Sequence, residues 1–115
     1  TTWAQVAKLT ASDAAADDEF HYSVGIDGSL AVIGARFDDE GSFFENSGAA
    51  YVFKTTDSGV SWAEVDKLTT SDGFAFDNLG FSVSIDGSLV VVGSPFTDDP
   101  CHSGSAFVFG PPVCL

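Results

Sequence analysis

The feature that most constrains this chain is an internal repeat. Residues 26–30, Ile-Asp-Gly-Ser-Leu, recur unchanged as residues 85–89, a shift of 85 − 26 = 59 positions. Residues 3–10 recur with the same shift as residues 62–69, and both copies keep the tryptophan and the Lys-Leu-Thr ending. A fixed period of tens of residues is typical of architectures that stack one supersecondary unit on the next. The chain is therefore expected to hold two copies of one small unit.

Each copy carries the signals of short antiparallel strands. In the first copy, large apolar residues alternate with smaller ones over residues 20–26, which is the period-2 pattern of a strand with two unlike faces. The Asp-Gly pair at residues 27–28 then predicts a type I′ hairpin turn, because both central residues of that turn need positive φ. Apolar residues 30–35 and 49–53 predict the second and third strands, and residues 62–69 the fourth.

Composition limits the classes of partner. The chain of 115 residues has 17 acidic residues against 4 Lys and Arg, which gives a formal net charge of −13. Such a surface repels nucleic acid and anionic membranes, and it suits divalent cations, a saline medium or a basic partner. No run of 18 apolar residues is present, so no membrane-inserted segment is expected.

Four short strands in a repeated order are typical of β-propeller blades. The order Phe-Gly, Ser-Val, tight turn, apolar strand, Gly-Ala-Pro and then Gly-Ser-Ala-Tyr-Val-Phe resembles the FG-GAP repeat of integrin α-type propellers. Four short segments carry the two signature motifs: Phe20-His21, Leu79-Gly80, Gly34-Ala35-Arg36 and Gly93-Ser94-Pro95. His21 and Arg36 depart from the motif, so looser turns are expected in the first blade.

The expected fold is all-β, with two four-stranded antiparallel blades of the β-propeller type. Residues 1–10 form an outer, closing strand, residues 11–69 the first FG-GAP blade, and residues 70–115 a second blade that lacks its fourth strand. The N-terminal strand is phased to complete either a last blade or the blade of a neighbouring chain.

Two blades cannot close a propeller ring, so two arrangements are open. In the first, residues 3–10 of one copy complete the second blade of a neighbour, and this head-to-tail strand exchange builds a ring or a filament. In the second, the chain is a fragment of a longer propeller. Apolar and aromatic residues are the candidates for the assembly interface: Trp3, Val6, Leu9, Phe43, Phe44, Phe107 and Phe109.

Calcium is the cation that the resemblance implies, but the family's usual loop of closely spaced aspartates is absent. Each turn that would hold it carries one carboxylate, Asp27 or Asp86, whereas Ca²⁺ takes six to eight oxygen ligands. Most of the other acids fall in loops that a blade would place at one end. These form a solvated rim, a docking surface for a basic partner, or a Ca²⁺ site with the candidate ligands Asp17, Asp18, Asp38, Asp39, Asp98 and Asp99.

The two cysteines, Cys101 and Cys114, flank the last expected strand. That strand carries the chain away from Cys101, so a bridge between the two requires a sharp reversal at residues 110–112. A disulfide within the chain, a disulfide to another chain and two free thiols are all open.

No nucleophile is matched with a base, so no enzyme activity is expected. The function predicted from the sequence is that of an extracellular or cell-surface structural or adhesion protein, whose partner is a second copy or an extracellular protein or glycan. The alternative is a ligand-binding module for a protein or glycan, in which the acidic loop face of a complete propeller is the binding surface. No cofactor other than Ca²⁺ is expected.

Overall fold

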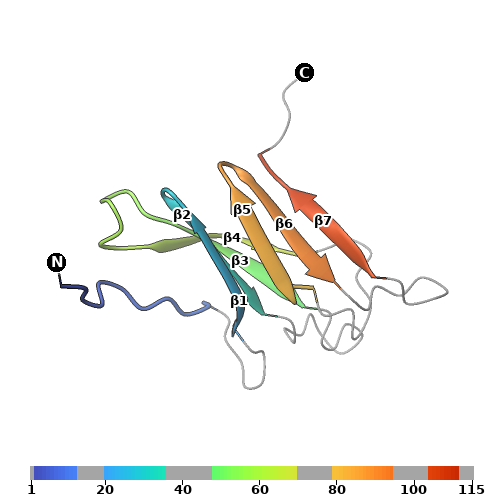
Figure 1. Ribbon diagram of the computed structural model, residues 1–115, viewed down its shortest axis with the longest axis horizontal. Coiled ribbons are helices and arrows are strands. Elements are labelled where there is room, and N and C mark those ends of the chain that lie inside the picture. The colour runs from blue at the N-terminus through green and yellow to red at the C-terminus, as the bar shows by residue number, and fades with distance from the viewer. Residues whose placement is uncertain (1, 13–19, 36–47, 70–78, 95–103, 112–115) are drawn as a thin grey trace.

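The computed structural model describes residues 2–12, 20–35, 48–69, 79–94 and 104–111. Within these ranges the chain is all-β, with two antiparallel sheets and no helix. This confirms the predicted fold class. The first sheet has the order β1-β2-β3-β4 and the second has the order β5-β6-β7 (Figure 1). The strands are β1 (Phe20–Asp27), β2 (Leu30–Ala35), β3 (Ala49–Lys54), β4 (Ala63–Leu68), β5 (Ser82–Asp86), β6 (Leu89–Ser94) and β7 (Ser105–Phe109).

Both predicted hairpins form, but their turns lie one residue later than expected: Asp27 pairs with Leu30 and Asp86 with Leu89, so the two-residue loops are Gly28-Ser29 and Gly87-Ser88. Gly28 connects β1 to β2 with φ of 57°, and Gly87 connects β5 to β6 with φ of 59°. Neither Ser29 nor Ser88 has a positive φ, so only the first central residue of each turn is left-handed. That is the pattern of a type II′ turn, in which glycine takes the first central position without steric cost, and the predicted type I′ turn is wrong. The two sheets therefore start from the same local structure, and we call them the first blade and the second blade.

Two hydrophobic clusters form the core, one on each face of the first blade. The outer cluster lies on the face turned away from the second blade, and the inter-blade cluster lies between the blades. The outer cluster consists of Ala11, Ala31, Ile33, Ala35, Ala49, Tyr51 and Phe53, with Leu9 and Trp62 packed against it. The inter-blade cluster consists of Val32, Ala50, Leu68, Leu79, Val90 and Val92, with Val52, Val83, Ile85, Phe107 and Phe109 packed against it.

The blades approach each other closely at glycines, among them Gly34 and Gly48. A Cβ atom on Gly34 would overlap the carbonyl oxygen of Gly80, and one on Gly48 would overlap the backbone of Leu79. Gly48 and Leu79 also form a parallel β-bridge between the two units. Only glycine lets the two backbones come this close, which is the structural reason for glycine at these positions of the repeat.

One expected strand is not formed. Residues 3–10 have the sequence of β4, yet they belong to neither sheet. The outer edge of β3 is already occupied by β4, so the first blade offers this segment no free edge there. A strand needs a paired neighbour for its backbone groups, and strand-like composition alone does not supply one. In the single chain residues 3–10 form no strand, and their role as an outer, closing strand stays a prediction.

Candidate functional site

The second blade ends in an open edge. In the first blade β3 pairs with β2 on one side and with β4 on the other, whereas its counterpart β7 pairs, among the described residues, with β6 alone. Figure 1 shows β7 at the border of the molecule with no described strand beyond it. An edge strand of this kind presents a row of N–H and C=O groups that can pair with another chain.

The side chains of β7 are only partly covered. Phe107 and Phe109 are half-buried and pack against the inter-blade cluster, and Val108 on the opposite face is exposed. Phe107 and Phe109, which the sequence predicts as interface residues, therefore lie on the edge strand β7.

The N-terminal segment is anchored at one end and exposed at the other. Ala11 is buried and Leu9 packs against the outer cluster. The backbone N–H and the hydroxyl of Ser12 donate to the Glu64 carboxylate at 3.0 and 2.9 Å. Farther out, Val6 is 67% exposed and the Trp3 side chain is 92% exposed. The segment is thus held where it meets β4 and presents its apolar residues to solvent.

The corresponding residues of β4 are packed. Leu68, the counterpart of Leu9, is buried in the inter-blade cluster. Trp62, the counterpart of Trp3, packs against the outer cluster, and its indole N–H donates to the Gly59 carbonyl oxygen at 3.0 Å. The tryptophan and the last leucine of this sequence are therefore more buried in the copy at residues 62–69, where β4 has a neighbouring strand, than in the N-terminal segment.

Asp57 organises the turn that delivers Trp62 to this position. Its carboxylate accepts hydrogen bonds from the Ser61 hydroxyl, the Ser61 backbone N–H at 2.8 Å and the Thr55 hydroxyl at 2.9 Å. These bonds, with Ser61 contributing most, lower the pKa of Asp57 from 3.8 to about 2. This network fixes the chain reversal between β3 and β4.

The hairpin turns of the two blades are joined by Asp27. Its Oδ2 accepts a hydrogen bond from the backbone N–H of Gly87 at 2.5 Å. The sequence predicted a turn-forming role for Asp27 and missed this bridge to the other blade. The Ser23 hydroxyl makes a second bridge by donating to the Gly80 carbonyl oxygen at 2.8 Å. Asp27 and Ser23 recur 59 positions later as Asp86 and Ser82. This recurrence is the sequence signal that points to a shared role for these residues.

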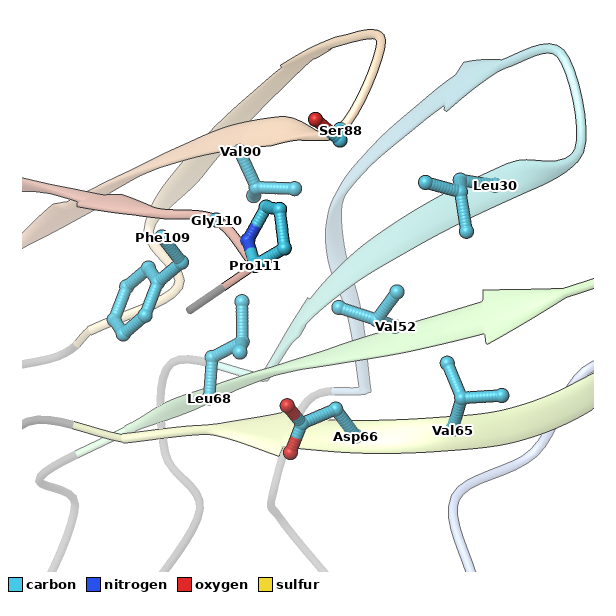
Figure 2. A pocket seen from close by; sticks show the side chains of 10 residues that line it. All are labelled: Leu30, Val52, Val65, Asp66, Leu68, Ser88, Val90, Phe109, Gly110 and Pro111. Atoms are coloured by element: carbon cyan, nitrogen blue, oxygen red, sulfur yellow. The ribbon is translucent and has the colours of Figure 1, made fainter. Parts of the chain in front are cut away.

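A cavity of about 260 Å³ opens between the blades next to β7 (Figure 2). Its walls are mostly apolar, and Asp66 is the charged residue among them. The end of β7 with the two residues that follow it, the turn of the second blade and the start of β6 form one wall, and β2, β3 and β4 of the first blade form the other. The lining residues are Leu30, Val52, Val65, Asp66, Leu68, Ser88, Val90, Phe109, Gly110 and Pro111.

Several residues nominated from the sequence lie outside the described ranges. These are the candidate metal ligands Asp17, Asp18, Asp38, Asp39, Asp98 and Asp99, the aromatic pair Phe43 and Phe44, and the cysteines Cys101 and Cys114. Among the residues that are described, no group of three or more His, Cys, Asp or Glu side chains is placed to hold a metal ion. No helix long and apolar enough to cross a membrane occurs there either.

Comparison with known proteins gives one match. The family model of the FG-GAP repeat matches residues 3–53 and 62–109, and each matched stretch begins at a tryptophan of the repeat. No curated protein and no solved structure matches the chain. FG-GAP repeats usually occur in extracellular or surface proteins, and the family is generally non-enzymatic. The stretch 3–53 contains β1, β2 and all of β3 except Lys54, and the stretch 62–109 contains β4 together with β5, β6 and β7. The two stretches cover well over half of the chain, and the chain belongs to the FG-GAP repeat family.

Proposed function

We propose that this protein is an extracellular, non-catalytic structural or adhesion protein whose copies associate head-to-tail by strand exchange. In this arrangement residues 3–10 of one copy pair with the open edge of β7 in the next copy. The observation that carries the proposal is that the described part of one chain holds both a strand edge without a partner and a copy of the fitting strand without a partner.

The repeat specifies a register for the exchanged strand. In the first blade, Val52 of β3 lies opposite Asp66 of β4. Residues of β7 follow those of β3 by 108 − 52 = 56 positions, and residues 3–10 precede those of β4 by 66 − 7 = 59 positions. Ala7 of one copy is therefore expected opposite Val108 of the next.

The exchange takes place between copies because the two elements lie apart within one copy. Figure 1 places the N-terminal segment and β7 at opposite sides of the molecule. A contact between unlike surfaces is heterologous, so it continues into a ring if the rotation closes and into a filament if it does not.

Exposed apolar residues support a packing contact that accompanies the strand exchange. Val24 and Ile26 of β1 are 67% and 65% exposed, whereas their counterparts in β5, Val83 and Ile85, pack in the inter-blade cluster. On the second blade Val91 and Val108 are exposed, whereas their counterparts in the first blade, Val32 and Val52, pack in the same cluster. The outward face of each blade thus carries residues whose counterparts on the other blade are packed in the contact between the two blades.

The turns offer a matching polar contact. Asp86 is the counterpart of Asp27, and Gly28 is the counterpart of Gly87. Within one copy, Asp27 accepts a hydrogen bond from the Gly87 N–H. In a head-to-tail assembly Asp86 of one copy accepts a hydrogen bond from the Gly28 N–H of the next copy in the same way. The blade-to-blade contact within the chain is thereby repeated between chains.

The experiment is a sedimentation measurement of native mass over a range of protein concentrations. We expect multiples of the 12.0 kDa chain. Each copy carries a charge of −13, so added salt should favour assembly by screening the repulsion between copies. A chain that stays at 12.0 kDa at every concentration and salt level would refute the proposal.

A deletion and a peptide test the exchanged strand itself. Removal of residues 1–8 leaves the anchor from Leu9 to Ser12 in place and should yield a monomer. A synthetic peptide of residues 1–12 should bind this monomer, and the same peptide with Val6→Pro and Lys8→Pro should not, because proline removes the backbone donors of a paired strand. Assembly of the deletion variant at the level of the intact chain would contradict the proposal.

A further inference from the structure

We infer that the cavity between the blades is the binding site for the Trp3 indole of a second copy. This inference rests on the proposed strand exchange and names the side chain that the cavity accepts. It would make the cavity an assembly site for an aromatic anchor.

In the first blade, the positions equivalent to one wall of the cavity lie beside a tryptophan. Ser88 and Pro111, which line the cavity, have Ser29 and Thr55 as their counterparts. On the first blade Ser29 and Thr55 line a groove together with Trp62. The tryptophan of the repeat thus lies beside the positions that correspond to the wall of the cavity.

The chain contains one further tryptophan of the repeat, and its side chain is exposed to solvent. The protein has 2 tryptophans, Trp3 and Trp62. Trp62 is packed against the outer cluster, whereas Trp3 is 92% exposed. A large aromatic side chain loses favourable burial when it stays in water, and aromatic anchors of this kind dominate protein interfaces.

The register of the exchanged strand places Trp3 beside the cavity. Ala63 lies opposite Lys54 at the end of the β3–β4 ladder, and Trp62 is the next residue. With the same register, Ala4 of the incoming strand lies opposite Gly110, and Trp3 lies one residue farther, beside Pro111. Figure 2 shows Gly110 and Pro111 at the wall of the cavity.

The side chains that line the cavity suit an indole ring. Leu30, Val52, Val65, Val90 and Phe109 give an apolar lining of the kind that buries an aromatic ring. The Asp66 carboxylate and the Ser88 hydroxyl supply acceptors at the same cavity for the indole N–H, which is a donor only. An aromatic body with one polar tip therefore fits the cavity better than a purely aliphatic side chain.

The test uses Trp3 as its own reporter. In the variant Trp62→Phe, Trp3 is the one remaining tryptophan. Its fluorescence and its quenching by iodide are recorded while sedimentation gives the mass at the same concentrations. We expect the emission to shift to shorter wavelength and the quenching to fall as the mass rises. If the mass rises while Trp3 stays fully quenchable, the cavity assignment is wrong and the strand exchange stands. If the mass never rises, both are refuted.

Further variants change the proposed contact from its two sides, the Trp3 side chain and the cavity wall. Trp3→Ala should raise the concentration needed for half-assembly by about 30-fold, whereas Trp3→Phe should retain part of the affinity. Trp3 is exposed in the single chain, so neither change should alter folding.

Val65→Phe fills the cavity from its first-blade wall and should weaken assembly, and Val60→Phe, at an exposed position outside the cavity lining, is the matched control. Equal assembly of Trp3→Ala and the unchanged protein would overturn the inference.

Discussion

The packing of the two blades into one unit can be tested at Leu79. This residue opens the second repeat, is 2% exposed and lies in the inter-blade cluster, where its backbone bridges to Gly48. Leu79→Ala removes buried carbon atoms and leaves a cavity between the blades. Substitutions of this kind in protein cores cost about 2–5 kcal/mol, and a value of about 3 kcal/mol is expected here.

Leu89 provides the matched control. It carries the same side chain in the same blade but is 52% exposed, so Leu89→Ala should cost no more than about 1 kcal/mol. The assay is urea denaturation of both variants, followed by far-UV circular dichroism at a concentration at which the protein is monomeric. Equal losses at the two positions would show that Leu79 is not buried by packing between the blades.

Three further predictions concern the contacts between and within the blades. Gly34→Ala should destabilise the fold by about 1–3 kcal/mol in urea denaturation, because its Cβ meets the backbone of the second blade, whereas Gly93→Ala meets mainly a side chain and should cost less. The depressed pKa of Asp57 contributes folding stability that is present above pH 4 and lost as the pH falls towards 2. Asp57→Asn should therefore flatten the dependence of stability on pH between 4 and 2. An unchanged dependence would contradict the role of Asp57 in this turn. Asp27→Ala should lower the stability of the monomer by removing an inter-blade hydrogen bond, whereas Asp86→Ala should leave the monomer unchanged and weaken assembly, as urea denaturation and sedimentation would show. The reverse pattern would contradict the proposed repetition of that contact.

Much of the fold follows from local sequence signals. The Asp-Gly pairs at residues 27–28 and 86–87 predict both hairpins, since the turn needs a conformation that glycine favours. Continuous apolar character over residues 30–35 predicts a buried strand, and β2 is buried along nearly its whole length. The recurrence at a fixed shift then predicts that the second unit has the same strands.

The N-terminal segment shows the limit of these signals. Residues 3–10 and 62–69 are nearly identical, yet the second forms β4 and the first belongs to no sheet. Strand formation depends on a free neighbouring edge, which is a property of the assembled fold and not of the segment. No local pattern distinguishes the two copies.

The candidate site was only partly predictable for the same reason. Phe107 and Phe109 were identified because aromatic residues on a terminal strand suggest an interface, and they do lie on the open edge. The cavity, however, is formed by residues of two sheets that are distant in sequence, such as Val52 and Pro111. The bridging role of Asp27 likewise depends on where the second blade places the Gly87 N–H.

The most direct test of strand exchange is a disulfide between copies at the predicted register. One variant carries Ala7→Cys and another carries Val108→Cys, both with Cys101→Ser and Cys114→Ser, and the two are mixed and oxidised. Directly opposed residues of an antiparallel pair have Cβ atoms about 4.5–5.5 Å apart, close enough for a disulfide after small adjustments. Strand exchange predicts a cross-linked species of twice the 12.0 kDa chain mass, which should not form when Thr2→Cys replaces Ala7→Cys. Absence of the Ala7–Val108 cross-link, or equal cross-linking from Thr2, would contradict strand exchange in this register.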